Sequence, residues 1–489
     1  MKIDRRKFLL GSTVFGIGVT GVGVYSNSLN ATNSKTKLPI PKLLDTKVLE
    51  KININIINAT HEFFPGIKSN TKGFDASYLG PTIRLYKGGK SELRFTNHLN
   101  EKTTIHGHGL HVDGKWDGGP QNVIQAKESL TYKYNIIQQA STNWYHPHLM
   151  GKTAEQVHAG LAGFILIEDE NSLSLGLPNT YGVDDIPLAI QDRTFLNGVM
   201  TPYKVTMEQV MDGLKEETFI VNGAIAPFQY VPAGWIRLRL LNGSNARYQR
   251  FSLSNGDSFV KIATEGGFLS KPIALSSLEM GPGERNEILI NMAETDINTM
   301  LVESVEGDGN IFTQLFNEPQ IALELRVDSS KVAINSIPKI LNNIEHYDPY
   351  DVAITRNFEL QMGGDGGNEG ENMSSNPHAM FSINGNPMDM KVINHTGKTN
   401  QLELWRIRSE EMRHPFHMHG TSFLILSQNG KPPKIEDRGW KDTVDINEGV
   451  VEVLLKFNVI STKEYPFMYH CHILEHEDAG MMGQFTVSK

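Results

Sequence analysis

Residues 470–481 read His470-Cys471-His472-Ile473-Leu474-Glu475-His476-Glu477-Asp478-Ala479-Gly480-Met481. The stretch holds the single cysteine of a 489-residue chain, three of its 17 histidines and a methionine. A lone cysteine is more often a small buried apolar residue than a ligand. A thiolate spaced closely with imidazoles and a thioether is instead typical of a blue copper electron-transfer site. The spacing around Cys471 therefore predicts such a site.

The tripeptide 470–472 is expected to contact two metal sites. Successive side chains of a strand point to opposite faces. His470 and His472 would face one way and Cys471 the other. The sulfur would then be joined by a few backbone bonds to histidines of a second site.

Histidines occur as His-x-His at four places in the chain. The four pairs are His106 and His108, His146 and His148, His417 and His419, and His470 and His472. On a strand, residues i and i+2 share a face about 6.6 Å apart, which suits two neighbouring metals. Two pairs lie in the first third of the chain and two in the last third, so one cluster of all eight must lie between two domains. Imidazole alone leaves the metal open among copper, zinc, iron and nickel, and the cysteine site favours copper.

His414 stands three residues before His417 and would face the opposite side of the strand from it. It is therefore expected to join Cys471 and His476 at the blue site. Met481 is the expected axial thioether, with Met482 as the alternative.

Bulk composition limits the class of protein. At the usual ~150 residues per domain, 489 residues indicate about three domains. The net charge of −9 gives no electrostatic basis for binding nucleic acid. With 45 glycines and 22 prolines, the chain resembles a turn-rich all-β protein, and one cysteine excludes an internal disulfide.

The N-terminus reads as a targeting segment, residues 1–35. The run Arg5-Arg6-Lys7-Phe8-Leu9-Leu10 resembles a twin-arginine signal, which exports folded proteins. The Gly-rich run 8–24 that follows is shorter than the ~20 residues of a membrane span. We expect a periplasmic or otherwise exported protein without stable membrane insertion; an uncleaved anchor is the alternative.

A turn followed by an alternating strand recurs at domain-sized intervals, about 150 residues apart. The turns fall at 79–82, 221–223 and 383–385, and the strands at 93–97, 236–242 and 402–407. Polar, turn-forming linkers are predicted near 169–182 and 327–350. The fold class predicted is all-β, with three consecutive cupredoxin-like Greek-key β-sandwiches at 38–170, 180–330 and 350–489.

The four histidine motifs together resemble the copper motifs of the three-domain multicopper oxidases. Supporting phrases are Asp117-Gly118-Gly119-Pro120-Gln121, Gly160-Leu161-Ala162-Gly163 and Gly439-Trp440-Lys441-Asp442-Thr443. Among these oxidases the bacterial cuprous oxidases of copper tolerance are most similar in our reading. The resemblance implies three cupredoxin domains, of which the middle one lacks copper ligands, and four copper ions.

Carried over by position, the resemblance implies three kinds of copper centre. The type 1 centre would use His414, Cys471, His476 and Met481, and the type 2 centre His106 and His417. The type 3 pair would use His108, His146, His148, His419, His470 and His472. Asp117 and Glu477 stand where the family places carboxylates that relay protons; ordinary turn carboxylates are the alternative.

The implied reaction couples one-electron oxidation of a substrate to four-electron reduction of dioxygen to water. The expected substrate is Cu(I), because thioethers suit Cu(I) and a carboxylate suits the Cu(II) product. Met362, Asp365, Glu410 and Met412 are the candidate substrate-copper residues. The loop 361–380 departs from the family because it is poor in methionine and histidine.

Two other functions stay open at this point. One is a general laccase that oxidises phenols or amines without a dedicated copper-substrate site. The other, of a different class, is a copper-free exported scaffold protein like the cell-division relatives of this fold, which lose ligands. All twelve ligand positions are filled here, which disfavours the scaffold. The expected partners are dioxygen and a small reductant, and the chain is expected to be a monomer.

Overall fold

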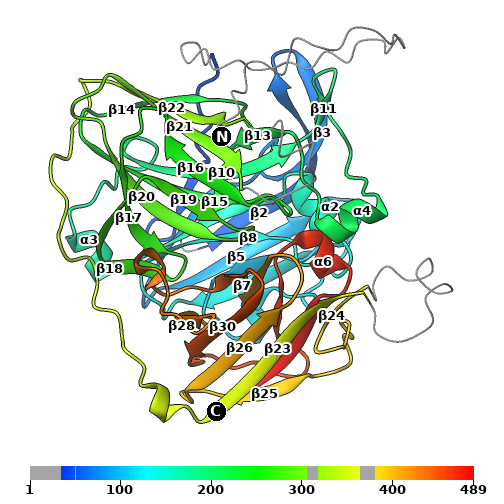
Figure 1. Cartoon of the computed structure of the whole chain (residues 1–489). Helices are drawn as coiled ribbons and strands as arrows, with labels where there is room; N and C mark the ends of the chain where they lie inside the picture. The colour runs from blue at the N-terminus through cyan, green and yellow to red at the C-terminus, as the bar shows by residue number, and fades with distance from the viewer. Residues whose placement is uncertain (1–34, 50, 306–317, 364–379) are drawn as a thin grey trace, which may run out of the picture. The chain divides into compact units, whose positions relative to one another are not determined.

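In the computed structural model, which describes residues 35–49, 51–305, 318–363 and 380–489, most of the secondary structure is strands arranged in paired sheets. These residues belong to one compact unit, 34–489. Buried and exposed side chains alternate in strands such as β2 (Lys51–Phe64). This alternation gives a sheet one apolar face, and two such faces close over a core (Figure 1).

The first pair of sheets supplies two of the histidine pairs. One sheet has the order β3-β2-β5-β7 and the other β1-β4-β9-β8-β6. The strand bounds are β1 Leu43–Asp45, β2 Lys51–Phe64, β3 Ile67–Phe74, β4 Thr82–Tyr86, β5 Lys90–Asn97, β6 His106–His108, β7 Ser129–Asn135, β8 Ser141–His146 and β9 Gly163–Glu168.

The second pair contains none of the predicted copper ligands. Its sheets have the orders β13-β10-β15-β20-β17-β18 and β14-β22-β21-β16-β19, and β11-β12 form a separate ribbon. The strand bounds are β10 Asp185–Arg193, β11 Phe195–Leu196, β12 Val199–Met200, β13 Thr218–Val221, β14 Phe228–Val231, β15 Trp235–Asn242, β16 Gln249–Leu253, β17 Phe259–Thr264, β18 Gly267–Leu275, β19 Ser277–Met280, β20 Arg285–Asn291, β21 Ile297–Ser304 and β22 Gln320–Val327. The lead-in residue Leu38 is buried in this core, and its N–H donates to Phe228 O at 2.8 Å.

The third pair supplies the other two histidine pairs and the cysteine. Its sheets have the orders β24-β23-β26-β30-β28 and β25-β32-β31-β27-β29. The strand bounds are β23 Ile354–Met362, β24 Phe381–Ile383, β25 His395–Lys398, β26 Glu403–Ser409, β27 His414–Met418, β28 Phe423–Gln428, β29 Thr443–Ile446, β30 Gly449–Leu455, β31 Phe467–Cys471 and β32 Met482–Ser488.

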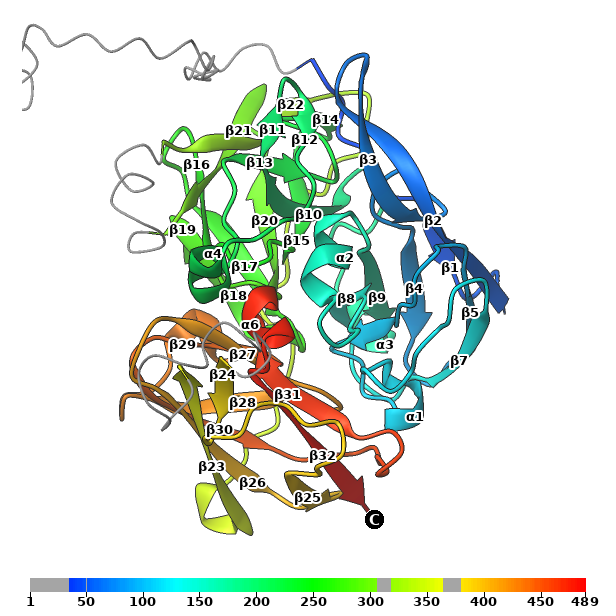
Figure 2. The same cartoon turned by 90° about the vertical axis from the view of Figure 1, so that its right-hand side faces the viewer.

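Short helices occupy some of the connections. Their bounds are α1 Gly114–Asp117, α2 Thr153–His158, α3 Glu170–Ser174, α4 Met207–Asp212 and α6 Leu474–Asp478. Helix α6 contacts both α2 and α4, so the segment after Cys471 meets connecting helices that lie between strands of the first pair of sheets and of the second (Figure 2). Within the described part of the chain no helix has the length and apolar character needed to cross a membrane.

The predicted all-β class is confirmed, and the repeat has a structural basis. The repeated strands β5, β15 and β26 each pair in parallel with β2, β10 and β23 respectively, and antiparallel with β7, β20 and β30. The turns Asn222-Gly223 and Asn384-Gly385 have positive φ at both residues, a geometry that favours Asn-Gly. The first predicted linker contains helix α3, which Asp169 caps by accepting from Ser172 N. The domain boundaries stay predictions, and residues 1–34 of the predicted signal segment lie outside the described residues.

Candidate metal centres

One buried group of possible ligands surrounds the cysteine. Cys471, the last residue of β31, has its Sγ 3.4 Å from His414 Nδ1 and 3.7 Å from His476 Nδ1. His414 begins β27 and His476 lies on α6. In the register of β27 and β31, Phe416 lies opposite Cys471, so His414, two residues before Phe416, shares the face of the sulfur. These three side chains form one potential metal group.

The two candidate axial methionines are placed differently. Met481 is fully buried in the same core cluster as Cys471, and its backbone O accepts from Cys471 N at 3.1 Å. Met482 begins β32 and pairs with His470, which puts its side chain on the histidine face of the strand. This arrangement favours Met481 over Met482 beside the sulfur.

Burial sets the charge state of the cysteine group. It lowers the pKa of His414 to about 4 and the pKa of His476 well below its ordinary value, so both imidazoles are neutral at pH 7. Burial raises the pKa of Cys471, so metal binding must displace the thiol proton. Neutral imidazole nitrogens and a sulfur that deprotonates on binding are the donors that copper accepts.

The eight remaining predicted ligands lie together and divide into two triads and a pair. One triad is His108, His146 and His472, and the other is His148, His419 and His470. The remaining pair, His106 and His417, forms a further possible metal group together with His108. The three ligand atoms of each triad lie within 4.8 Å of one another. His470 Nε2, for example, is 3.2 Å from His148 Nε2 and 3.4 Å from His419 Nε2. Six ligands in two triads suit two adjacent metals, and the pair suits a third.

Strand register brings these histidines together. His106 lies opposite His146 across β6 and β8, and His417 lies opposite His470 across β27 and β31. His106 and His419 stack at 3.9 Å between ring centroids, which joins the first sandwich to the third. The cluster is therefore built between two domains, as the distribution of the motifs predicts.

The outer nitrogen of several imidazoles is fixed by a backbone carbonyl. Nδ1 of His106, His146 and His417 lies 2.8 Å from the carbonyl oxygens of Asp117, Pro147 and Asp442 respectively. A proton on Nδ1 leaves the lone pair on Nε2 for a metal.

The buried ring nitrogens that have no hydrogen-bond partner show whether a metal fits this cluster. Among the described residues, Nε2 of His106 and of His417 and both ring nitrogens of His472 have no hydrogen-bond partner although they are buried. A buried polar atom without a partner costs about 1–3 kcal/mol, so such atoms need an explanation. Metal ions bound between the triads would satisfy these lone pairs, and the residues present therefore fit copper.

The two predicted proton-relay carboxylates contact the cluster from different sides. Asp117 ends helix α1, and its Oδ2 accepts from His419 Nδ1 at 2.7 Å. Glu477 on α6 has carboxylate oxygens 3.4 Å from His148 Nδ1 and 3.2 Å from His470 Nδ1. Burial would raise the pKa of Asp117, but His419 and His106 hold it below its ordinary value. Burial raises the pKa of Glu477 well above its ordinary value. The site thus shifts the pKa values of its two carboxylates in opposite directions, a difference typical of acid–base pairs.

The candidate substrate-copper residues are only partly assembled. Met362 and Met412 are half-buried against the core cluster that contains Cys471. Glu410 is exposed and paired with Arg408. Asp365 lies outside the described residues. The four residues are therefore not seen as one site.

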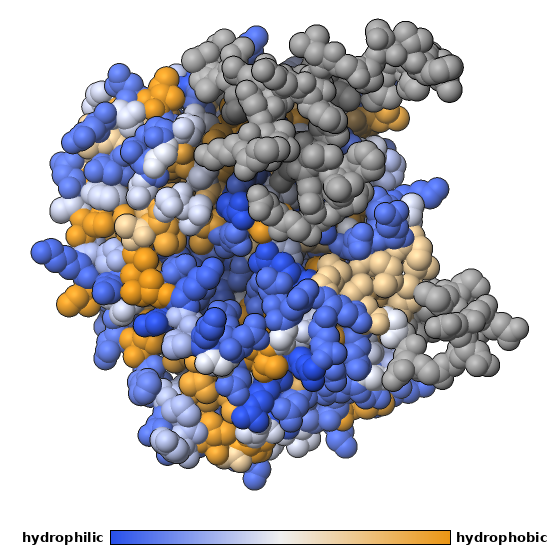
Figure 3. Space-filling model, in the orientation of Figure 1, coloured by the Kyte–Doolittle hydropathy of each residue, from blue (hydrophilic) through white to orange (hydrophobic). Residues whose placement is uncertain are grey.

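Sequence reasoning missed a contribution of the second sandwich to this region. Met211 on α4, like Met362 and Met412, packs against the core cluster that contains Cys471, and its backbone O accepts from His476 Nε2 at 2.9 Å. Met207, one helical turn earlier, is 49% exposed. Figure 3 shows moderately hydrophobic residues gathered at the right of the face, over the region of α4 and α6 in Figure 1. No local signal connected α4 to residues 414–476.

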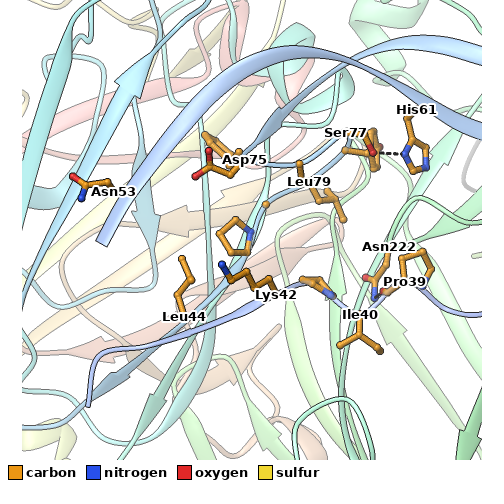
Figure 4. A pocket seen from close by; sticks show the side chains of 16 residues that line it. Pro39, Ile40, Lys42, Leu44, Asn53, His61, Asp75, Ser77, Leu79 and Asn222 are labelled. Atoms are coloured by element: carbon orange, nitrogen blue, oxygen red, sulfur yellow. Dashed lines mark hydrogen bonds between the residues drawn. The ribbon is translucent and has the colours of Figure 1, made fainter. Parts of the chain in front are cut away.

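A separate cavity of about 310 Å³ lies away from the histidine cluster (Figure 4). The lead-in 39–44 lines it together with residues of β2 and of the turn 75–81. His61 Nδ1 lies 2.8 Å from Ser77 Oγ and His61 Nε2 lies 2.9 Å from Gly223 O, so both ring nitrogens are used. None of the predicted site residues lines this cavity.

The chain is similar to known proteins over most of its length. Residues 44–172 and residues 364–489 each match a family described as multicopper oxidase. The chain is 36% identical over 471 residues to the multicopper oxidase mco of Staphylococcus aureus, across 94% of this chain and 95% of that protein. It is 34% identical over 499 residues to the cell division protein FtsP of Salmonella typhimurium, across 100% of this chain and 99% of that protein.

A solved structure is similar over nearly the same length. It is a bacterial laccase-like multicopper oxidase, CueO, from the lignin-degrading bacterium Ochrobactrum sp., described with oxidase activity towards lignin model compounds and lignosulfonate. The TM-score is 0.84 at 36% identity, over 92% of this chain and 100% of that one.

Proposed function

The chain belongs to the multicopper oxidase family, and we propose that it is an oxidoreductase that oxidises Cu(I) one electron at a time and reduces dioxygen to water. The observation that carries the proposal is the placement of Cys471. Its sulfur lies with His414 and His476, while the residues on either side of it, His470 and His472, belong to the two triads. A one-electron site and a multi-electron site thus share one tripeptide.

In this proposal the predicted ligands belong to three kinds of copper centre. His414, Cys471, His476 and Met481 hold the type 1 copper, and His106 and His417 hold the type 2 copper. His108, His146, His472, His148, His419 and His470 hold the type 3 pair. Bound copper would supply the one-electron redox chemistry at all of these positions. The backbone from Cys471 to His470 and His472 supplies a covalent path between the centres, supported by the 3.0 Å contact of His470 Nδ1 with Cys471 O.

Glu477 and Asp117 have complementary tasks in this proposal. Glu477, buried against His148 and His470 with a raised pKa, can give up a proton inside the site. Asp117 holds His419 by its carboxylate and His106 by its backbone oxygen, so it orients both rings. Reduction of dioxygen to water consumes four protons for four electrons, which explains why a proton donor must stand at the cluster.

The proposed substrate is Cu(I) because three methionines, Met211, Met362 and Met412, pack against the core cluster that contains Cys471. Met211 O accepts from His476, Met362 lies opposite Phe381 in β24, and Phe381 stacks on His476 at 4.3 Å. Met412 stands two residues before His414. Soft sulfur donors at this position would bind Cu(I), which favours Cu(I) over a phenol as the substrate.

Dioxygen uptake by the copper-loaded protein tests the substrate. Cu(I) and a simple phenol are compared as electron donors, with free Cu(II) chelated in the phenol assay. Fast uptake with Cu(I), and phenol turnover only when copper is added, supports a cuprous oxidase. Equal phenol turnover without added copper makes the protein a general laccase, the activity class of the similar Ochrobactrum enzyme.

A copper-free scaffold is the second candidate, because similarity to FtsP spans the whole chain. The unpartnered buried nitrogens of His106, His417 and His472 argue against it, because a copper-free scaffold would leave these buried polar atoms unsatisfied. A protein that stays colourless after copper loading and consumes no dioxygen with either donor would support the scaffold.

We also propose that the protein is exported from the cytoplasm. Residues 1–35 carry the twin-arginine-type segment, and an exported cuprous oxidase in copper tolerance would act outside the cytoplasm. Replacing Arg5 and Arg6 by Lys should leave the protein in the cytoplasmic fraction, and unchanged export would contradict a twin-arginine signal.

A further inference from the structure

Asp442 contacts one histidine from each of the two ligand-bearing sandwiches. Its Oδ1 lies 3.3 Å from His108 Nε2, and its backbone O lies 2.8 Å from His417 Nδ1. The His108 and His417 rings are stacked with 3.7 Å between centroids. One residue thus reaches two ligands that the proposed function assigns to different copper centres.

These contacts decide which nitrogen each ring presents to a metal. When Nε2–H of His108 donates to Asp442, Nδ1 keeps the lone pair, and this atom lies 3.4 Å from His146 Nε2 in the same triad. When Nδ1–H of His417 donates to the Asp442 carbonyl, Nε2 keeps the lone pair. A ligand that rotates or changes tautomer loses its metal-binding atom, so Asp442 must itself be held still.

Arg285 holds Asp442 from the sandwich that has no copper ligands. It is the first residue of β20 and is fully buried. Nη1 donates to Asp442 Oδ1 at 2.7 Å, and Nη2 donates to Oδ2. Its Nε donates to Thr142 O at 3.1 Å, and Nη2 lies 3.3 Å from Asn143 Oδ1. Thr142 and Asn143 belong to β8, the strand that ends at His146, so the guanidinium joins all three sandwiches.

Gly109 gives independent support for the close approach of this pair. It follows His108 directly and has φ +86°. A Cβ at this position would lie 2.5 Å from Arg285 Nη2 and 2.7 Å from Asp442 Oδ2. The added Cβ would also meet Asn143 Oδ1. The glycine of the first His-x-His-Gly motif therefore lets Arg285, Asp442 and Asn143 approach this closely, in a backbone conformation that favours glycine.

We propose that Arg285 is a positioning residue for the trinuclear centre, acting through Asp442 to fix the ring orientation and tautomer of His108 and His417. The inference rests on the proposed function, because it concerns ligands of that same centre. The planar guanidinium matches both carboxylate oxygens and the β8 carbonyl at once, which a lysine ammonium cannot do. The second sandwich then contributes to catalysis although it supplies no ligand.

The test compares Arg285→Lys and Arg285→Met with the matched control Arg239→Met. Arg239 on β15 is equally buried and makes a bidentate pair with Asp185 at 2.7 Å and 3.0 Å. It also contacts Thr142. Within the described part of the chain, Arg239 has no hydrogen bond or ion pair to a predicted copper ligand or to Asp442. Arg239 also pairs with Glu287 at 3.2 Å and with Glu168 at 3.3 Å, so it reports the cost of losing a buried ion-pair network that does not touch the ligands.

Two readouts are measured on the copper-loaded proteins: the type 2 copper electron paramagnetic resonance spectrum and the rate of copper loss to a chelator. Both Arg285 variants should alter the type 2 hyperfine splitting and speed loss of that copper by about 10–100-fold, with the blue absorption retained. Arg239→Met should lower the melting temperature and leave both readouts unchanged.

The proposal is overturned if the Arg285 variants keep the wild-type spectrum and loss rate, or if Arg239→Met changes them equally. Should Arg285→Met not fold, Arg285→Lys decides, since it keeps the buried positive charge. A wild type that shows no type 2 signal would overturn the proposed function and this inference together. A normal wild-type signal that is insensitive to Arg285 overturns the inference alone.

Discussion

Cys471, the last residue of β31, and His414, the first residue of β27, place Sγ and Nδ1 only 3.4 Å apart in a fully buried position. The two residues are far apart in the sequence, so the contact exists only when the third sandwich is folded. The same β31 residue is covalently joined to a histidine of each triad. A metal at this position would therefore bind the folded chain only, and its binding should stabilise the fold.

Removal of copper should lower the melting temperature. Ligands that bind only the folded state stabilise it, by about 4 kcal/mol at a free concentration of 1,000 Kd. The metal-free and copper-loaded proteins are compared by differential scanning calorimetry, and reloading should restore the transition. Identical transitions would mean that copper does not bind between the two ligand-bearing sandwiches.

Met481→Leu should change the type 1 centre, whereas Met482→Leu should not. Met481 is buried in the cluster that contains Cys471, while Met482 faces the His470 side of its strand. Loss of a thioether from the axial position raises the reduction potential, because Cu(II) loses a donor. Redox titration of the blue absorption measures the midpoint. A larger change in the Met482 variant would reverse the assignment.

Glu477→Gln should slow dioxygen reduction by about 100-fold or more while the blue absorption stays unchanged. The amide keeps the shape but cannot deliver a proton to the side of His148 and His470. The matched control is Glu475→Gln on the same helix, whose carboxylate accepts from Leu214 N and Asn245 Nδ2 instead of facing the cluster. Reoxidation of the fully reduced enzyme is followed by stopped flow. Equal rates for wild type and Glu477→Gln would remove Glu477 from the proton path.

The double variant Met362→Leu and Met412→Leu should raise the KM for Cu(I) by about tenfold and leave phenol oxidation unchanged. Leucine keeps the apolar contact with the core cluster but removes the soft sulfur donors. Met390→Leu, a partly exposed methionine outside that cluster, serves as the control. An unchanged KM for Cu(I) would favour the laccase alternative.

His395 should make the metal-free protein less stable in acid. It stacks on Phe485 at 4.8 Å, and burial followed by the nearby Arg356 lowers its pKa from 6.5 to about 3. Below pH 6.5 the unfolded chain binds a proton that the folded chain does not, so the free energy of unfolding falls as pH drops, by about 2 kcal/mol at pH 5. His395→Phe should remove that part of the difference between urea denaturations at pH 7.5 and pH 5. Equal pH dependence in the two proteins would show that His395 does not contribute.

The sequence predicts well what depends on local periodicity. Alternation along 470–472 and 414–417 assigns each side chain to a face, and the structure places His470 and His472 away from Cys471 as that alternation requires. The glycine turns and alternating strands likewise mark β5, β15 and β26. These features need only the geometry of a single strand or turn.

Apart from the histidine cluster, contacts between sandwiches could not be predicted, because no residue spacing encodes them. Arg285 carries no motif, and its role depends on the way β20, β8 and the segment before β29 meet. Met211 joins the cysteine region only because α4 packs against α6. Leu38 reads as the start of the first domain, yet its side chain fills the core of the second pair of sheets. Burial and long-range packing decide these positions.

The absorption and paramagnetic resonance spectra of the copper-loaded wild type test the central claim most directly. The account predicts an intense blue absorption that Cys471→Ser abolishes, one type 1 and one type 2 signal, and further copper that is silent because the two triads hold a coupled pair. A colourless protein, or a blue absorption that survives Cys471→Ser, would contradict the assignment of these residues to copper.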